Sequence, residues 1–381
     1  MSSTPVPPSG QESLHVVQVV GSGNARTCAH VRSLAAGLVA RGVRVTVCAP
    51  SATEPAYDFT GVGARFVSLC ARADPETAVA LRVVCGDADV VHAHGLRAGA
   101  LAVPALYGRR RRTPLVVTWH ARARSAGTRA RLLWVLERRV VRAARVVFGT
   151  TSDLVDRARR HGARDARLAP VTVPVPRADP AGAPRPADGA HGEREKTRAE
   201  LGVTGRPLIF ALGRLDAHQG FGTLLTASRA WRGLEPPPLL AVAGEGPARP
   251  ALQRRIDDEE LPARLLGRRG DALELLAAAD VAVLPTRWEG RAVVAQEALR
   301  AGVPLVATAV GGLPELVGDA ALLVPYGDAN ALAGAVTDLL ADPARRRSLA
   351  AAGRAQAATW PNEDETVAQV LSVYDELTLG A

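Results

Sequence analysis

Short apolar runs alternate with longer amphipathic stretches along most of this chain. The apolar runs are rich in Val, Leu and Ala and end at Gly, Pro or a polar residue, which is typical of strands buried on both faces of a parallel sheet. We expect strands at residues 14–20, 43–48, 89–94, 115–119, 145–149, 168–173, 207–212, 239–243, 264–266, 281–284, 303–307 and 320–324. We expect helices at residues 28–40, 128–144, 153–161, 221–231, 248–260, 271–278, 328–341 and 343–358, and one that begins after Asn362. Strands that alternate with helices predict an α/β protein with doubly wound parallel sheets.

The chain is long enough for two such sheets, because 381 residues exceed what one hydrophobic core usually organises. Residues 176–200 are rich in Pro, Ala and Gly and show no periodicity, which predicts a flexible linker. We therefore expect a first Rossmann-like domain at 1–175, a second at 201–358 and a C-terminal helical segment at 359–381.

The most informative stretch is 280–317, which reads as strand, turn, helix, strand and turn. The first strand ends at Pro285, and the helix is expected to begin at Glu289-Gly290. A helix start offers unpaired N–H groups and a partial positive charge, and a glycine lets a ligand approach the backbone, so the pattern favours a bound phosphate. Glu297 would lie roughly 8 Å further along the helix, within reach of a ribose attached to that phosphate.

In open α/β sheets, ligands collect beyond the carboxyl ends of strands. The first half has two candidate features there: a pair of histidines and a glycine loop. His120 follows one predicted strand and His94 ends another, although a lone histidine is more often structural than functional. The loop with Gly21 and Gly23 follows the first strand; it could be a tight turn or a phosphate-binding loop, and it lacks the third glycine of a dinucleotide fingerprint.

The charge is divided unevenly between the two halves. Residues 1–186 hold 27 Arg against 12 Asp and Glu, a net charge of +15, whereas the remainder has a net charge of −6. Five of these arginines lie on the predicted helix 128–144, which either rests on anionic lipid or is a solvated helix of an Arg-rich protein. Aromatic residues do not interleave with the basic ones, so we expect no nucleic acid partner. The Arg-for-Lys bias is of the kind that a GC-rich, actinobacteria-like genome imposes.

Composition also bears on metals and location. The cysteines lack metal-type spacing and read as buried reduced thiols: Cys28, Cys48, Cys70 and Cys85. We see no metal-ligand cluster and expect no metal or cofactor; Asp87-Ala88-Asp89 reads as a solvated turn. The first residues show no basic region followed by an apolar one, so the expected location is the cytoplasm, with association to the cytoplasmic face of a membrane as an open option.

Four motifs in order give the second half a specific resemblance. They are Gly213-Arg214-Leu215 after a strand, 243–247 (AGEGP) after the next, the pair Glu289 and Glu297, and 311–315 (GGLPE). This set resembles the retaining glycosyltransferases of family four, the glycosyl transferases group 1, strongly over 200–325 and more loosely before that. The resemblance implies a GT-B fold, in which two Rossmann-like domains face each other across a cleft and the C-terminal helix crosses back to the first domain.

The resemblance also implies an activity and roles for the residues. The family moves a hexose from a nucleoside-diphosphate sugar, here UDP- or GDP-linked, to an acceptor with retention of configuration. By matching position, Arg214 would neutralise the diphosphate, Glu297 would bind the ribose and Glu289 the hexose. His120 would contact the sugar from the first domain. Further donor-side positions are Gly213, Gln219, Gly290, Arg291 and Ala292, and the acceptor-side positions are Gly21, Gly23 and His94.

Two positions depart from the family pattern. Gln219 stands where the family normally has a lysine that contacts the diphosphate, which removes a positive charge. Arg291-Ala292 stands where the family usually has an aromatic or aliphatic residue and then a small one. We hypothesise that Arg291 supplies part of the missing charge.

Other functions remain open from the sequence. A catalytically weakened nucleotide-sugar-binding protein would fit the two departures, and a sugar-nucleotide epimerase has a similar architecture. An NAD oxidoreductase would need the full glycine fingerprint, which the first loop does not provide. The acceptor is open and could be lipid-linked or inositol-type.

Overall fold

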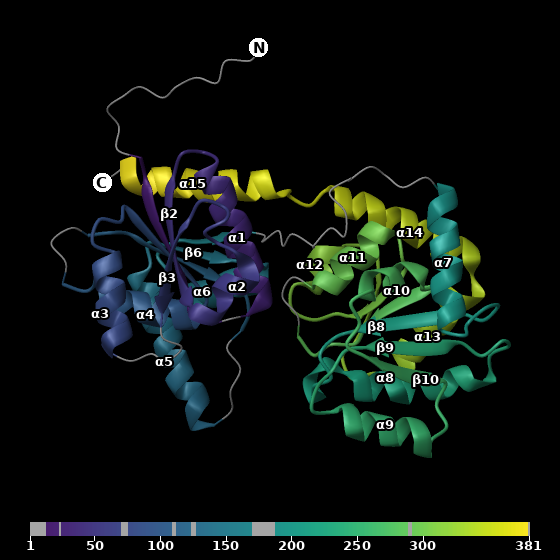
Figure 1. Ribbon diagram of the computed structural model, residues 1–381. Helices are drawn as coiled ribbons and strands as arrows, with labels where there is room; N and C mark the ends of the chain where they lie inside the picture. The colour runs from purple at the N-terminus through teal and green to yellow at the C-terminus, as the bar shows by residue number, and fades with distance from the viewer. Residues whose placement is uncertain are drawn as a thin grey trace, which may run out of the picture. The chain divides into compact units, whose positions relative to one another are not determined.

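The computed structural model describes residues 13–22, 24–69, 75–108, 112–122, 127–169, 187–288 and 292–379. Its contacts divide the chain into two compact units: Met1–Val175 with Pro361–Ala381, and Pro176–Trp360. Each unit is built on one parallel sheet with helices on its faces (Figure 1).

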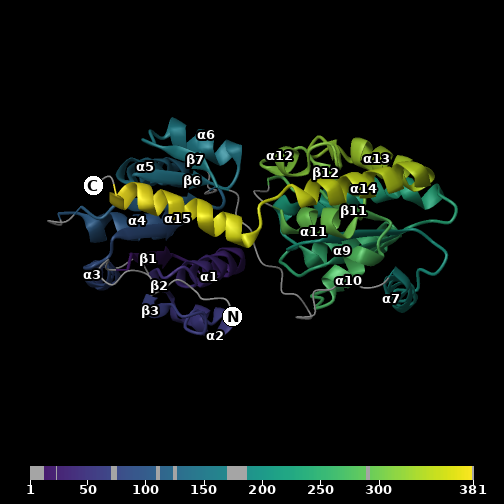
Figure 2. The same cartoon turned by 90° about the horizontal axis from the view of Figure 1, so that it is seen from above.

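The first unit contains a sheet of seven strands in the order β3-β2-β1-β4-β5-β6-β7. The strands are β1 His15–Val20, β2 Arg44–Pro50, β3 Arg65–Leu69, β4 Val90–His94, β5 Leu115–Trp119, β6 Val146–Gly149 and β7 Ala166–Leu168. The helices are α1 Ala25–Val39, η1 Ser51–Thr53, α2 Glu54–Tyr57, α3 Pro75–Val84, α4 Leu96–Leu106, α5 Thr128–Ala143, α6 Ser152–Arg160 and, from the end of the chain, α15 Glu363–Leu379. Helix α15 packs against α1 and β4 (Figure 2).

One face of this sheet is covered by α1 and α15, whose apolar residues form a single core with the strands. Leu34 and Leu38 of α1 and Val370 of α15 are buried there beside Phe148 of β6. Burying each such side chain contributes roughly 1.5–3 kcal/mol of hydrophobic stabilisation, so the C-terminal helix is part of the first unit's core. This confirms the prediction that the last helix returns to the first domain.

The second unit contains a sheet of six strands in the order β10-β9-β8-β11-β12-β13. The strands are β8 Leu208–Leu212, β9 Leu239–Ala243, β10 Ala263–Gly267, β11 Val281–Leu284, β12 Leu305–Thr308 and β13 Leu322–Val324. The helices are α7 Ala187–Glu200, η2 Ala217–Gln219, α8 Phe221–Ser228, η3 Arg229–Gly233, α9 Arg249–Asp258, α10 Ala272–Ala278, α11 Val293–Ala301, α12 Leu313–Val317, α13 Ala329–Ala341 and α14 Pro343–Ala358. Helices α10, α11 and α12 pack on one face, and α8, α9 and α13 on the other (Figure 1).

Every described strand pairing in both sheets is parallel, and the predicted doubly wound α/β class is confirmed. Cys28, Cys48 and Cys85 are buried, as predicted, and Cys70 lies outside the described residues.

Part of the segment expected to be a flexible linker is helical. Helix α7 covers Ala187–Glu200, and Arg194 and Arg198 of this helix bind the two oxygens of Asp280 at 2.7 and 2.9 Å. These long-range ion pairs stabilise a helix that has no apolar periodicity to predict it. Residues 170–186, which include much of the predicted strand at 168–173, lie outside the described residues.

Candidate functional site

The strand order reverses between β1 and β4 in the first sheet and between β8 and β11 in the second. In open α/β sheets, ligands bind beyond the carboxyl ends of the strands at such switch points. The described candidate residues of each unit lie at or near this edge of its sheet.

Gly21 follows β1 at the switch point of the first unit. A Cβ at this position would lie 2.6 Å from the backbone nitrogen of Ala98, so the residue must be glycine for the first turn of α4 to pack against the loop. This contact supports the tight-turn interpretation of Gly21. Gly23 lies outside the described residues.

His94 and His120 meet at the carboxyl ends of β4 and β5. The register pairs His94 with Thr118, which brings the residue just past β5 alongside the end of β4. The Nδ1 atom of His94 lies 3.2 Å from the Nε2 atom of His120. The ring of His30, on α1, lies edge-on to both, with centroid distances of 5.6 and 5.5 Å. With His92, these residues form what we call the histidine cluster.

A chain of hydrogen bonds continues from the histidine cluster into the core. His94 Nε2 lies 2.6 Å from Gln18 Oε1, and Gln18 Nε2 donates to the Tyr374 hydroxyl at 2.9 Å. The same hydroxyl lies 2.6 Å from His92 Nδ1, and His92 Nε2 lies 2.7 Å from Thr118 Oγ1.

The orientation of the Gln18 amide gives this chain a direction. Because its oxygen can only accept, His94 must carry its proton on Nε2, and His94 Nδ1 is then an acceptor for His120 Nε2–H. The hydroxyl of Tyr374 accepts from Gln18 and has its own hydrogen to donate to His92 Nδ1. A neutral His120 in this arrangement keeps Nδ1 as an unprotonated acceptor.

Burial keeps these histidines neutral. Loss of hydration lowers the pKa of His92 to about 3, and it lowers the pKa values of His94 and His120 well below the ordinary value, with neighbouring histidines adding to each effect. Burial also raises the pKa of the Tyr374 hydroxyl. The arrangement can therefore position and accept hydrogen bonds, and it resists protonation at neutral pH.

At the switch point of the second unit, Gly213 and Arg214 follow β8. The Arg214 side chain is 72% exposed, and its Nε atom lies 2.7 Å from Asp216 Oδ2. This contact uses one edge of the guanidinium, and an exposed guanidinium at a strand end suits an anionic ligand.

Gln219 lies beside Gly213. A Cβ on Gly213 would lie 3.6 Å from the Gln219 side-chain oxygen, so the amide occupies the space next to the β8 turn. The second glycine motif packs on the same turn, because a Cβ at Gly244 would overlap the carbonyl oxygen of Gly213. Leu215 N–H donates to the carbonyl of Glu245 at 3.0 Å, which ties the two motifs together.

The turn after β11 is fixed by two buried threonines. Thr286 Oγ1 donates to the carbonyl of Trp288 at 3.1 Å, and Thr308 Oγ1 donates to the carbonyl of Thr286 at 2.5 Å. Three predicted site residues, Glu289, Gly290 and Arg291, come next and lie outside the described residues.

The helix expected to begin at Glu289-Gly290 begins later. Its first residue is Val293, and Ala292 is a buried N-cap with an extended backbone. Glu297 is therefore four residues into α11, or about 6 Å along its axis rather than 8 Å. Polarity alone did not reveal that the backbone of Ala292 is extended.

Glu297 is held by a neighbour on the same helix. Its Oε1 atom lies 2.5 Å from Arg300 Nη1, and the Glu297 side chain is 14% exposed. The Arg300 guanidinium in turn lies over the Trp360 ring, 5.4 Å from its centroid. The carboxylate predicted to bind ribose thus has a fixed direction in the structure.

Helix α5 forms where the sequence predicted it, but its faces differ from the prediction. Leu132, Leu136, Val140 and Ala144 repeat at helical spacing and predict an apolar face, yet Leu132 is 68% exposed. Glu137 is buried instead, with Arg157 at 2.6 Å and His161 at 3.3 Å. Burial raises the pKa of Glu137 and lowers that of His161. The sequence did not reveal this buried ion pair, because Glu137 lies on α5, whereas Arg157 lies on α6 and His161 directly follows α6.

Sequence reasoning missed three buried polar residues of the first unit: Gln18 and Tyr374 of the chain of hydrogen bonds, and His30 of the histidine cluster. Gln18 gave a usable signal, because it is the one polar residue inside the apolar run 16–20. His30 and Tyr374 gave none, since each looks like an ordinary residue of an amphipathic helix.

The described part of the chain contains no group of three or more His, Cys, Asp and Glu placed to hold a metal ion. Among the described helices, none is long and apolar enough to span a membrane.

Two doubly wound sheets, each with candidate residues at its switch point, together with a C-terminal helix that completes the first unit, define a GT-B protein. A model of the family described as glycosyl transferases group 1 matches residues 193–356, and one described as a glycosyl transferase 4-like domain matches residues 28–174. The chain belongs to the group 1 glycosyltransferases.

Relatives of known activity support this assignment. A D-inositol 3-phosphate glycosyltransferase of Jonesia denitrificans is 30% identical over 326 residues, which cover 77% of this chain and 73% of the relative. A GDP-mannose-dependent alpha-(1-6)-phosphatidylinositol monomannoside mannosyltransferase of Mycolicibacterium smegmatis is 35% identical over 195 residues, 47% of this chain and 51% of the relative. The chain thus spans about half of the length of that mannosyltransferase.

Solved structures share the fold. HepE of Anabaena in complex with UDP has a TM-score of 0.76 at 18% identity, and the match covers 96% of this chain and all of that one. Sucrose-phosphate synthase of Thermosynechococcus elongatus has a TM-score of 0.74 at 22% identity, with 97% of this chain and all of that one covered. The predicted GT-B fold is confirmed.

Proposed function

We propose that this protein transfers a hexose from a nucleoside-diphosphate sugar to a hydroxyl of an acceptor, with retention at the anomeric carbon. The observation that carries the proposal is the arrangement at the switch point of the second unit. There an exposed guanidinium, a glycine-lined turn and a helix with a fixed glutamate lie at neighbouring strand ends, within a chain of the group 1 family.

In this proposal the bond between the anomeric carbon and the diphosphate oxygen breaks, and a bond to the acceptor oxygen forms on the same face of the sugar. The leaving diphosphate develops the largest charge. Arg214 and the N–H groups at the start of α11 would stabilise it, and this is where catalysis gains most. We propose that these groups suffice without a metal or cofactor.

The remaining candidates would orient the donor. Glu297 would accept hydrogen bonds from the ribose hydroxyls, and Glu289 would bind the hexose. His120, with an unprotonated Nδ1, would accept a hydrogen bond from the sugar. Glu289 and Glu297 are not a glycosidase pair, since one of them is assigned to the nucleotide rather than to the reacting bond. Gly213, Gly290 and Ala292 would let the backbone approach the ligand.

The names of the relatives suggest which substrates to test first. One is GDP-mannose-dependent and acts on a phosphatidylinositol monomannoside, and another acts on D-inositol 3-phosphate. We therefore propose GDP-mannose as the first donor, with UDP-glucose as the comparison, and an inositol-type or lipid-linked acceptor. An Arg-rich first unit could hold the enzyme on an anionic membrane surface while it meets such a lipid.

The decisive experiment measures nucleoside diphosphate release and donor binding by the purified protein, with each donor and each acceptor. Glu297→Ala should abolish release, whereas Glu274→Ala, at an exposed glutamate of α10, should leave it unchanged. Nuclear magnetic resonance of the product's anomeric proton reports retention or inversion. Absence of binding to every nucleotide sugar would overturn the proposal.

One observation favours a second candidate, a nucleotide-sugar-binding protein with weakened catalysis. Gln219 sits beside Gly213 without the charge that the family normally has there. Tight binding without release in the presence of every acceptor tested would support it. A titration of Arg291→Ala tests the proposed compensation, because unchanged donor affinity would remove Arg291 from the phosphate site.

A further inference from the structure

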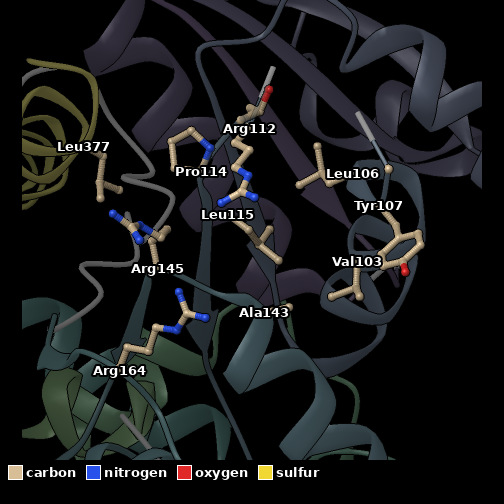
Figure 3. A pocket seen from close by; sticks show the side chains of 12 residues that line it. Val103, Leu106, Tyr107, Arg112, Pro114, Leu115, Ala143, Arg145, Arg164 and Leu377 are labelled. Carbon is tan, nitrogen blue, oxygen red and sulfur yellow. The ribbon is translucent and has the colours of Figure 1, made fainter. Parts of the chain in front are cut away.

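A pocket of about 760 Å³ opens in the first unit, away from the histidine cluster (Figure 3). It is lined by residues at the amino ends of strands: Leu115 begins β5, Arg145 immediately precedes β6, and Arg164 shortly precedes β7. His120 follows the carboxyl end of β5, so the two places are separated by the length of a five-residue strand, roughly 16 Å. The pocket is therefore distinct from the candidate site.

Three arginines gather in this pocket. Arg112, Arg145 and Arg164 are exposed, and Figure 3 shows their side chains around the same pocket, each from a separate segment. None of the described residues that line the pocket is acidic. Three cations brought together without a carboxylate among them repel one another, and a bound anion would relieve that repulsion.

The carboxylates closest in sequence to the lining residues are already bound to another arginine. Asp165 follows Arg164, and Glu376 precedes Leu377, another lining residue. Both carboxylates bind Arg167, at 2.5 and 2.8 Å. Hydrogen bonds to these two acids raise the pKa of Arg167. Asp165 and Glu376 are thus engaged outside the group of three arginines.

Two carbonyl groups at the end of α4, which also borders the pocket, accept hydrogen bonds from an arginine. A helix C-terminus carries a partial negative charge that would repel an anion. Here the side chain of Arg82 donates from Nη1 to the carbonyls of Tyr107 at 2.6 Å and Ala105 at 3.4 Å. A fourth guanidinium therefore offsets the unfavourable end of the helix.

Much of the rest of the wall is apolar. Val103 and Leu106 of α4, Leu115 of β5 and Leu377 of α15 line it, and Figure 3 shows Val103 and Leu106 on the side away from Arg145 and Arg164. A free inorganic ion would leave this wall in contact with water. A ligand with both an anionic group and an apolar group would use both sides of the pocket.

We propose that this pocket binds an organic phosphate, a phosphate mono- or diester that carries an apolar substituent. The guanidinium groups match the phosphate oxygens in bidentate geometry, and the volume accommodates a small apolar group beside it. Such a ligand could be a free metabolite or the headgroup region of an anionic lipid. The site is independent of the proposed transfer reaction.

Calorimetric titration of the full-length protein with hexyl phosphate tests the proposal, with inorganic phosphate and hexanol as partial ligands. The protein should carry Arg214→Ala, so that binding at the donor-side arginine is not counted. We expect hexyl phosphate to bind at least ten times more tightly than either partial ligand. We also expect Arg145→Gln combined with Arg164→Gln to raise its dissociation constant at least ten-fold.

The matched control is Arg139→Gln, which removes an exposed arginine of α5 outside the pocket and should leave affinity unchanged. Equal losses in Arg139→Gln and the double variant would overturn the proposal, as would equal affinity for inorganic and hexyl phosphate. Sedimentation with vesicles of phosphatidylglycerol identifies the source. Vesicle binding that the double variant loses indicates a lipid headgroup, and hexyl phosphate binding without vesicle binding indicates a soluble ester.

Discussion

The hydroxyl of Tyr374 lies 2.6 Å from Nδ1 of His92, across 282 positions of the chain. Both residues are fully buried. Through Gln18 the same hydroxyl connects to His94, which contacts His120. The C-terminal helix therefore contributes a polar group to the interior of the first unit, and this group is linked through Gln18 and His94 to His120, the residue proposed to contact the sugar.

Replacing Tyr374 with Phe should destabilise the first unit and disturb His120. The change leaves His92 Nδ1 and the Gln18 amide without their buried partner, which costs about 1–3 kcal/mol. Urea denaturation measures this loss. Long-range ¹H–¹⁵N correlation spectra report the tautomer of His120, which we expect to become mixed once the chain is broken.

Tyr57→Phe is the control, because it removes a tyrosine hydroxyl of the same unit that is outside this chain of hydrogen bonds. It should leave the His120 spectrum unchanged. A Tyr374→Phe protein whose His120 keeps a single Nε2–H tautomer would show that the hydrogen-bond chain does not set the state of that histidine.

The histidine cluster should make the protein sensitive to acid. The folded-state pKa of His92 is lowered to about 3 by burial, against an ordinary 6.5 in the unfolded chain. As pH falls below about 6.5 the unfolded state takes up the proton first, so stability that is present at neutral pH is lost toward pH 3. For His92 alone the loss between pH 7 and pH 5 is about 2 kcal/mol.

Urea denaturation at pH 7, 6 and 5 measures this dependence in the wild type and in His92→Gln, which cannot titrate. The variant should lose less stability on acidification, by about the amount assigned to His92. His218→Gln, in the second unit, is the control and should follow the wild type. An equally steep acid loss in His92→Gln would contradict the assignment.

Most of the fold could be predicted because buried parallel strands are continuous apolar runs. The predicted strand 281–284 coincides with β11, and Pro285, which follows the apolar run, marked the end of the strand correctly. Strand β3 was missed, since RFVSL lies at the edge of the sheet and begins with an exposed Arg65. Helix α7 was missed because its support, Asp280, lies far away in sequence.

Part of the candidate site could be predicted by the same reasoning. The rule that ligands meet the carboxyl ends of strands placed His94 and His120 at one edge, and the structure brings them into contact. The rule could not find Tyr374, because the partners of a buried polar group are set by packing between distant segments. Nor could it show that Arg300 holds Glu297, since any acid and base three residues apart on a helix have the same spacing.

The contact between the two glycine motifs gives a prediction about stability. Gly244 has a φ of +135°, and a Cβ there would overlap the carbonyl of Gly213. Gly244→Ala should therefore lower the free energy of unfolding of the second unit by about 2 kcal/mol. Thermal and urea denaturation measure the change.

Gly334→Ala is the matched control, because nothing lies within 4 Å of a Cβ at this position of α13. Alanine favours a helix interior, so this change should stabilise the protein by up to about 1 kcal/mol. If both substitutions had the same effect, the close approach of the motifs would not be a constraint on Gly244.

The pairing of Glu297 with Arg300 predicts a change in donor affinity with little change in stability. An ion pair three residues apart on a helix, with its arginine open to solvent, contributes only about 0.5 kcal/mol to the fold. If it fixes the direction of the carboxylate, Arg300→Ala should raise the KM for the donor several-fold and leave the kcat close to that of the wild type. Arg347→Ala, at an exposed arginine of α14, should change neither value. An unchanged KM in Arg300→Ala would mean that Glu297 does not need this partner.

Removal of metal ions should leave the proposed transfer intact. The negative charge of the leaving diphosphate must be neutralised. We propose that the exposed guanidinium of Arg214 and the N–H groups at the start of α11 neutralise it. Nucleoside diphosphate release after dialysis against EDTA should therefore match the untreated enzyme. Addition of Mg²⁺ or Mn²⁺ should not increase it. Arg214→Ala should lose at least ten-fold in kcat, and metal should not restore it. Activity that EDTA abolishes and Mn²⁺ restores would show that protein groups alone do not neutralise the diphosphate, which is the expected weak point of a site with Gln219 in place of a lysine.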